Sequence, residues 1–146
     1  MDLDITSPLT GRKIIAGWRL NGDLIWFRSG KQLVRCDRNN SLRAKLPSAM
    51  GNMLDYILSS NKNMFYYDEL SFYLMNENKL WFSRERLHKL ITDLHLILSE
   101  YGFENYLIRS IKDEVYFLNP SLIKIPVYDE EYNKFFDVTW PSGSKG

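Results

Sequence analysis

The hydrophobic pattern of this 146-residue chain changes its period at Leu46-Pro47. Before this point, short apolar stretches are interrupted at close intervals by residues that favour turns, such as Asn21-Gly22 and residues 37–40. After it, apolar residues recur every three or four positions, which is the spacing that places them on one face of a helix. We therefore expect an antiparallel sheet followed by helices.

The first part of the chain predicts a four-stranded antiparallel meander. Asn21-Gly22 favours a type I′ hairpin turn, because both central positions of that turn need a positive φ. Trp18, Trp26 and Phe27 are expected to supply bulk to the packed face of this sheet. The expected strands cover residues 14–20, 24–28, 32–36 and 41–45.

Three helices are predicted after Pro47. The first is expected to end near residues 59–61, and the second, shorter one covers about residues 67–75 before residues 76–79 interrupt it. The third covers about residues 83–101, with Ser83 as N-cap and Gly102 just past its end. Its predicted core stripe consists of Leu87, Leu90, Ile91, Leu94, Leu98 and Tyr101.

Two β-rich runs, at residues 106–111 and 115–118, predict a hairpin after the third helix. Residues 119–146 contain three prolines and no sustained period, so we expect a C-terminal tail or linker. We expect this tail to pack through Ile125, Tyr128, Phe135 and Phe136. The predicted organisation is an N-terminal arm at 1–12, one domain at 13–118 and the tail at 119–146.

Several protein classes are disfavoured by composition. The first residues include Asp2 and Asp4 where a signal peptide would be basic, and the longest apolar runs have four residues, too few to span a membrane. The single Cys36 cannot form an internal disulfide, and we expect it to be buried in a strand. The chain lacks a glycine-rich phosphate loop, a nucleophile elbow and metal-ligand spacing around His88 and His95, so we expect no enzyme activity, no cofactor and no metal.

The order of sheet, three helices and hairpin resembles the winged-helix domain of OmpR/ToxR-type transcriptional regulators. The resemblance covers about residues 13–118 and rests on the order and spacing of its matches. Residues 64–70 are similar to the family's entry into the second helix, and residues 108–112 followed by Tyr116 are similar to the wing strand. The first-helix and recognition-helix patterns are matched by Leu46-Pro47, Met53-Leu54 and Leu58, and by Leu87, Ile91, Leu94 and Leu98.

The resemblance implies an α+β fold, a winged helix-turn-helix with an N-terminal four-stranded antiparallel sheet, three helices and a C-terminal β-hairpin wing. It also implies a bacterial, sequence-specific DNA-binding transcriptional regulator. Its third helix would enter the major groove, and its wing, residues 106–118, would lie on the backbone or minor groove. The implied partners are promoter double-stranded DNA, RNA polymerase, and a second copy or a partner regulator.

The implied location is the cytoplasm. Many ToxR-type regulators continue into one membrane helix, so a longer protein extending beyond Gly146 would make this chain the cytoplasmic part of a single-pass inner-membrane regulator.

Seven residues are candidates for contacts with DNA. Basic side chains at the start of the third helix and in the hairpin would contact phosphates, and side chains on the outer helix face would read base edges. The competing interpretations are a surface pair of an arginine with Glu85 and an ordinary solvated helix face. The candidates are Arg84, Arg86, His88, Lys89, Thr92, Arg109 and Lys112.

The charge distribution favours weak binding and keeps a second function open. The net charge is +1, and residues 61–118 carry seven basic against nine acidic residues. Asp113 and Glu114 stand where the family wing has glycines and a hydrophobic residue, and they would repel phosphates. The alternative is a degenerate winged-helix protein–protein interaction module, an adaptor or antagonist of a related regulator.

Two apolar features bear on that alternative. Leu96 lies opposite the predicted core stripe; it would contact methyl groups, a second protomer or a polymerase subunit if exposed, or would pack under the tail. The loop at residues 80–82 would contact polymerase or DNA, unless Phe82 packs onto Leu87 as a hydrophobic staple.

Overall fold

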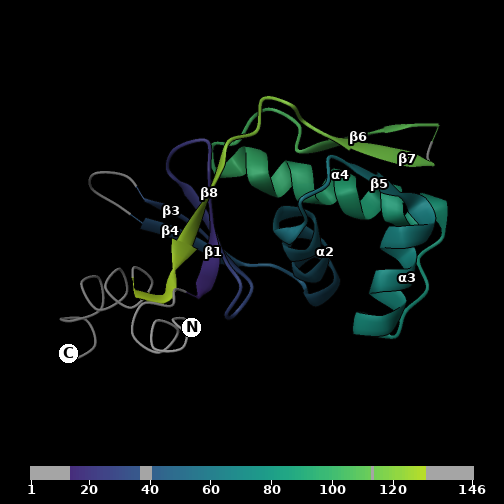
Figure 1. Ribbon diagram of the computed structural model, residues 1–146, viewed down its shortest axis with the longest axis horizontal. Helices are drawn as coiled ribbons and strands as arrows, with labels where there is room; N and C mark the ends of the chain where they lie inside the picture. Colours follow the sequence, from purple (N-terminus) through teal and green to yellow (C-terminus); the bar gives the residue numbers. More distant parts are fainter. Residues whose placement is uncertain (1–13, 37–40, 113, 131–146) are drawn as a thin grey trace, which may run out of the picture.

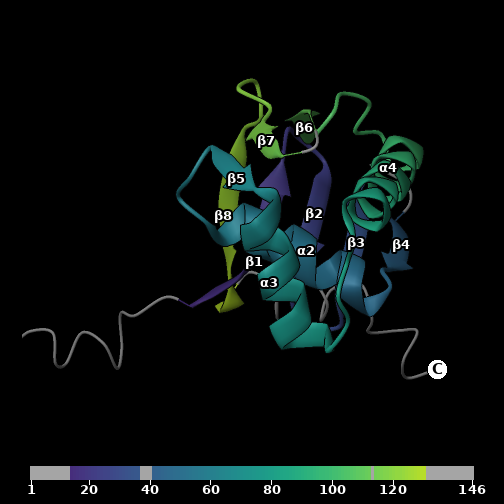
Figure 2. The same cartoon turned by 90° about the vertical axis from the view of Figure 1, so that its right-hand side faces the viewer.

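The computed structural model describes residues 14–36, 41–112 and 114–130, and these residues form an α+β fold (Figure 1). A five-stranded antiparallel sheet has the order β4-β3-β2-β1-β8, and a smaller three-stranded sheet has the order β5-β7-β6. Figures 1 and 2 show the helices together on one face of the larger sheet. The elements are β1 (Ile15–Leu20), β2 (Leu24–Phe27), β3 (Gln32–Cys36), β4 (Ser41–Lys45), α2 (Ser48–Ser59), β5 (Met64–Tyr66), α3 (Tyr67–Asn78), α4 (Arg84–Glu100), β6 (Ile108–Ile111), β7 (Val115–Leu118) and β8 (Lys124–Tyr128).

The four strands predicted before Pro47 are confirmed, with a difference at the first turn. Asn21 and Gly22 have φ values of 40° and 119°, as their positions in a tight turn require. Leu20 pairs with Leu24, so the connection has the three residues that the expected strand bounds leave, whereas the loop of a type I′ turn has two. Gly17 is needed on β1 because a Cβ at this position would lie 1.9 Å from the carbonyl oxygen of Trp26.

The expectation of a four-stranded sheet is wrong, because β8 adds a fifth strand. It pairs antiparallel with β1 and places Pro126 opposite Trp18 at the edge of the sheet. A proline is tolerated there because one side of an edge strand needs no ladder hydrogen bond. This proline masked the strand in the sequence. Of the residues expected to pack from the tail, Ile125 is exposed and Tyr128 is half-buried, while Phe135 and Phe136 lie outside the described residues.

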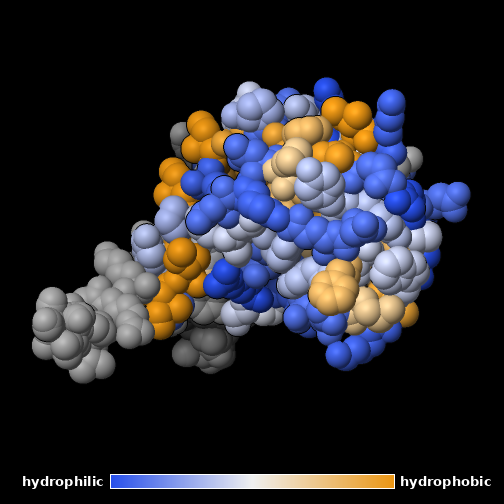
Figure 3. All heavy atoms as spheres, turned by 45° about the vertical axis from the view of Figure 1, so that its right-hand side comes forward, coloured by the Kyte–Doolittle hydropathy of each residue, from blue (hydrophilic) through white to orange (hydrophobic). Residues whose placement is uncertain are grey.

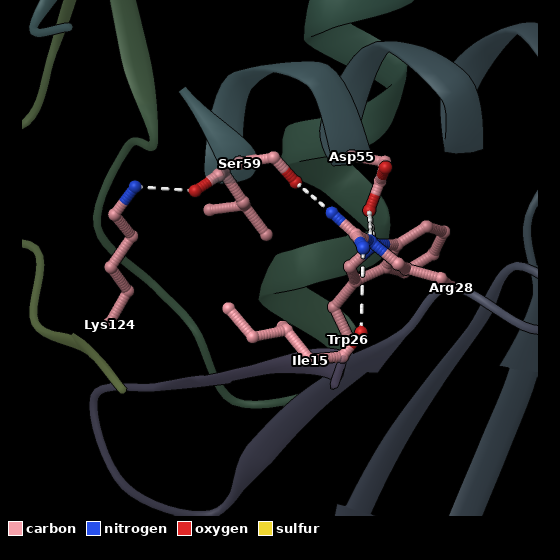
Figure 4. A network of polar contacts seen from close by, with 7 residues as sticks. Ile15, Trp26, Arg28, Asp55, Ser59 and Lys124 are labelled. Carbon is pink, nitrogen blue, oxygen red and sulfur yellow. Dashed lines mark hydrogen bonds and ion pairs between the residues drawn. The ribbon is translucent and has the colours of Figure 1, made fainter. Parts of the chain in front are cut away.

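Polar contacts join the large sheet to α2 (Figure 4). The Asp55 Oδ1 atom accepts hydrogen bonds from Trp26 Nε1 at 3.1 Å and from Arg28 Nε at 3.0 Å. Lys124 of β8 donates its ammonium protons to the carbonyl oxygens of Leu58 and Ser60 at the end of the same helix. A cation at this position also interacts favourably with the helix dipole, so β8 stabilises α2 as well as the sheet.

Helix α3 is longer than predicted. Its last residue is Asn78. Lys79 caps the helix with a φ of 60° and donates its N–H to the carbonyl of Met75. Asn78 accepts a hydrogen bond from the Asn52 side chain at 2.9 Å and donates one to Ser48 at 3.0 Å. These bonds to α2 hold the last turn, although two of its residues, Asn76 and Asn78, have weak helix propensity.

The hairpin is confirmed, but it belongs to a three-stranded sheet that was not expected. The short strand β5 lies between α2 and α3 in the chain and pairs with β7, with Phe65 opposite Tyr116. The first hairpin strand begins at Ile108, two residues later than predicted. The strand starts later because the carbonyl of Tyr106 accepts a hydrogen bond from the side chain of Asn119 rather than from a strand.

The main core lies between the helices and one face of the large sheet. Trp26 is fully buried in it, and Trp18 packs against it while partly exposed. Phe27 instead belongs to a second cluster, with Ile25, Val34 and Val127. The expectation of one packed face for Trp18, Trp26 and Phe27 is therefore wrong, because successive side chains on a strand point to opposite faces. The side chain of Cys36 lies outside what the structure describes.

Candidate nucleic-acid interface

Helix α4 is fixed by its cap and by one buried stripe. Ser83 accepts a hydrogen bond from the Arg86 N–H at 3.1 Å, which confirms the predicted N-cap. Phe82, immediately before the cap, and Leu87 are both buried in the main core, which favours the staple interpretation of Phe82. The rest of the buried stripe consists of Ile91, Leu94 and Leu98.

The opposite face of α4 is exposed to solvent. It carries Glu85, Lys89, Thr92 and Leu96, in agreement with the helical spacing of the sequence. Leu96 is 61% exposed, which favours exposure over packing, the two alternatives that the sequence left open. Figure 3 shows one face of the molecule, on which a largely hydrophilic surface surrounds separate hydrophobic patches.

Arg84 links the start of α4 to the hairpin. Its guanidinium forms an ion pair with Glu114, beside the hairpin tip, and lies 4.4 Å from the ring centroid of Tyr67. The sequence suggested Glu85 as the surface partner of this arginine, but the ion pair is with Glu114. Because both side chains are about half exposed, the pair contributes little stability. It nevertheless competes with any phosphate for the arginine.

The other two cations of the first helical turns also have partners within the chain. Arg86 donates a hydrogen bond to the carbonyl of Trp81 at 3.2 Å and stacks 4.6 Å from the ring centroid of Phe82. Lys89 forms an ion pair with Asp93, one turn further along the helix, at 3.2 Å. Exposed pairs of this kind are weak, so both cations can exchange their partner for another anion.

A shallow groove between α4 and β6 brings three candidates together. His88 and Thr92 lie on its helix side, and Arg109 lies on its hairpin side. The Arg109 guanidinium stacks 4.0 Å from the ring centroid of Tyr106, which also lines the groove. The remaining candidate, Lys112, lies at the exposed tip of the hairpin with a φ of 56°, while its neighbour Asp113 lies outside the described residues.

His95 forms the joint between α4 and the hairpin. Its Nε2 atom accepts a hydrogen bond from the Leu107 N–H at 3.1 Å and a longer one, at 3.5 Å, from the Ile108 N–H. Burial lowers the pKa of His95 below its usual value of 6.5, so the ring is neutral at pH 7. From the sequence, this residue was considered only as a metal ligand together with His88, and its partners Leu107 and Ile108 are too far along the chain to be inferred from spacing.

All seven candidates lie on α4 or on the β6–β7 hairpin, and the groove brings three of them, His88, Thr92 and Arg109, together. Figure 1 shows the hairpin running along α4 toward the end of the helix that carries Arg84. The described residues contain no group of three or more His, Cys, Asp or Glu side chains that could hold a metal ion. The described part of α4 and the hairpin offers exposed cations, the Thr92 hydroxyl group and exposed apolar side chains such as Leu96 and Ile111 to a ligand.

Comparison with known proteins gives no further assignment. No family model, curated protein or solved structure matches this chain. Across the part of the chain that the structure describes, the helices are too short or too polar to cross a membrane.

Proposed function

We propose that this chain is a winged helix-turn-helix domain of the OmpR/ToxR type that binds double-stranded DNA as part of a transcriptional regulator. The observation that carries the proposal is the pairing of α4 with the β6–β7 hairpin: a capped helix exposes one face beside a hairpin that bears Arg109 and Lys112. A helix of this kind and an adjacent hairpin can contact the same duplex, the helix in the major groove and the hairpin on the neighbouring backbone or minor groove.

Dimensions support this mode of binding. Helix α4 has 17 residues and is therefore about 25 Å long, and a B-DNA major groove about 12 Å wide admits an α-helix. His88, Lys89 and Thr92 then face the bases, while Arg84, Arg86, Arg109 and Lys112 face phosphates. The strand β5, between the first two helices, braces the hairpin through β7.

Charge makes the proposed binding weak. The Arg84–Glu114 and Lys89–Asp93 pairs occupy two of the cations, and phosphate neutralisation is the main sequence-independent source of affinity for DNA. One domain would therefore need a second copy or a partner regulator for useful occupancy of a promoter. In this proposal the protein works in the cytoplasm, alone or as the cytoplasmic part of an inner-membrane regulator, and acts on RNA polymerase at promoters.

A second candidate function is a protein–protein interaction module related to such regulators. It is favoured by the large apolar side chains that α3 and the loop after it expose, namely Phe72, Leu80 and Trp81. Exposed apolar groups of this size commonly mark contacts with a partner protein.

A gel-shift titration of the full chain on DNA upstream of its own gene tests the first proposal. Replacing Lys89 or Arg86 by alanine should weaken binding at least about fivefold, because each removes a contact with a base or a phosphate. Lys45→Ala, on β4 of the large sheet, is the control and should bind like the wild type.

The recognition assignment is wrong if neither Lys89→Ala nor Arg86→Ala weakens binding. If the wild-type chain shows no saturable binding to DNA at low salt and co-purifies with a protein, the second candidate replaces the first.

A further inference from the structure

The exposed face of α4 carries few of the side chains that most often read base edges. The helix contains no asparagine or glutamine, the residues that bond adenine at two points. Its two arginines, which would suit guanine, both lie in the first turn, where Arg84 pairs with Glu114 and Arg86 bonds the Trp81 carbonyl. Hydrogen-bonded recognition by the middle of the helix is therefore limited to His88, Lys89 and Thr92.

Methyl groups occupy this middle part instead. Thr92 and Leu96 are four residues apart, so they are neighbours on the exposed face, and both are exposed. Leu96 is 61% exposed and lies opposite the buried stripe, where it adds nothing to the core. Together they present one threonine methyl and two leucine methyl groups at the centre of the surface that would enter the major groove.

Thymine is the common base that offers a methyl group in the major groove, at its C5 atom. Burying apolar groups against one another is favourable in proportion to the area removed from water. We infer that α4 recognises thymine through contacts of its C5 methyl group with Thr92 and Leu96. This inference rests on the proposed DNA-binding function and names the kind of site bound: duplex DNA with thymines beneath the middle of α4.

Uracil-substituted DNA provides the matched test, because uracil keeps every hydrogen-bonding group of thymine and lacks only the methyl. A random duplex pool is enriched by gel shift with the full chain at low salt and is then amplified with either dTTP or dUTP. The uracil pool should bind about fourfold more weakly for each methyl contacted, and therefore about sixteenfold more weakly for two.

Four variants assign the effect to the two side chains. Leu96→Ala and Thr92→Ser, which remove methyl groups, should reduce the preference for thymine over uracil. Thr92→Val, which keeps a methyl group and loses the hydroxyl, should retain it. Ile125→Ala, an exposed apolar residue on β8, is the control and should leave both the affinity and the preference unchanged.

The outcomes separate the inference from the function on which it rests. Equal binding of the thymine and uracil pools overturns the methyl inference and leaves DNA binding standing. A preference that persists in both Leu96→Ala and Thr92→Ser also overturns it, because the methyl then acts through DNA shape. Failure to enrich any duplex at low salt overturns DNA binding itself, and the inference with it.

Discussion

His95 lies in the second half of α4, where its side chain serves the fold. Its Nε2 atom accepts backbone N–H groups at the start of the hairpin, which requires a neutral ring. A protonated ring would turn this acceptor into a donor facing other donors. The orientation of the hairpin relative to α4 therefore depends on the protonation state of one side chain.

This dependence predicts a pH effect on stability. Because burial lowers the pKa of His95 in the folded chain, the unfolded chain binds more protons below pH 6.5. The contribution of His95 to the free energy of unfolding is complete above about pH 6.5. It is lost as the pH falls toward the pKa of His95 in the folded chain. His95→Gln keeps an acceptor but does not titrate, so the decrease in the free energy of unfolding between pH 7.5 and 5.5 should be smaller than in the wild type. The difference is at most about 1 kcal/mol, because solvent screens the partly exposed ring.

Urea unfolding at the two pH values measures this difference, with His88→Gln as the control histidine substitution. The assignment is wrong if His88→Gln flattens the pH dependence and His95→Gln does not.

Predictions about single residues succeeded where nearby residues in the sequence determine the structure. Ser83 as an N-cap and the exposure of Leu96 follow from residues within one or two helical turns. The partner of Arg84 did not follow, because Glu114 is 30 positions away and is brought near only by the hairpin. The seven DNA-binding candidates now have positions and partners, and their contacts with DNA stay predictions.

At the scale of elements, the sequence predicted those helices and strands that have a strong hydrophobic period or that are bounded by turn-forming residues. Strands β1–β4, helices α2 and α4 and the hairpin all have such signals. Strand β5 has only three residues, and β8 contains Pro126, so neither stands out from a loop. The last turn of α3 is held by Asn78 bonds to α2, which are tertiary contacts that override weak local propensity.

The contact between α4 and the hairpin predicts a gain in DNA binding. Glu114→Gln removes the ion-pair partner of Arg84 and a negative charge beside the proposed DNA surface. The freed arginine should add about one phosphate contact, so affinity at low salt should rise and the slope of log K against log salt should steepen by about 1. Fluorescence anisotropy with a labelled duplex at several salt concentrations measures both quantities.

Glu77→Gln, on α3, makes the same change of charge away from the hairpin and is the control. Equal effects of the two substitutions would mean that overall charge, and not the release of Arg84, controls binding.

At the scale of the whole molecule, composition and element order predicted an α+β fold, and the structure confirms it. The number of strands in the large sheet was underestimated, because the fifth strand comes from the chain segment expected to be a tail. A net charge of +1 does not decide the function, since DNA contacts depend on where the cations lie and on which of them are already paired.

The central claim is that the outer face of α4 and the β6–β7 hairpin form one surface for duplex DNA. Titrating the ¹⁵N-labelled full chain with its upstream duplex at low salt, followed by NMR, tests this claim residue by residue. The account predicts saturable shifts of the backbone amides of Lys89, Thr92, Leu96 and Arg109, with little change in β3 and β4. Saturable shifts confined to the large sheet or to the loop at residues 80–82, or no saturable shifts at all, would contradict it.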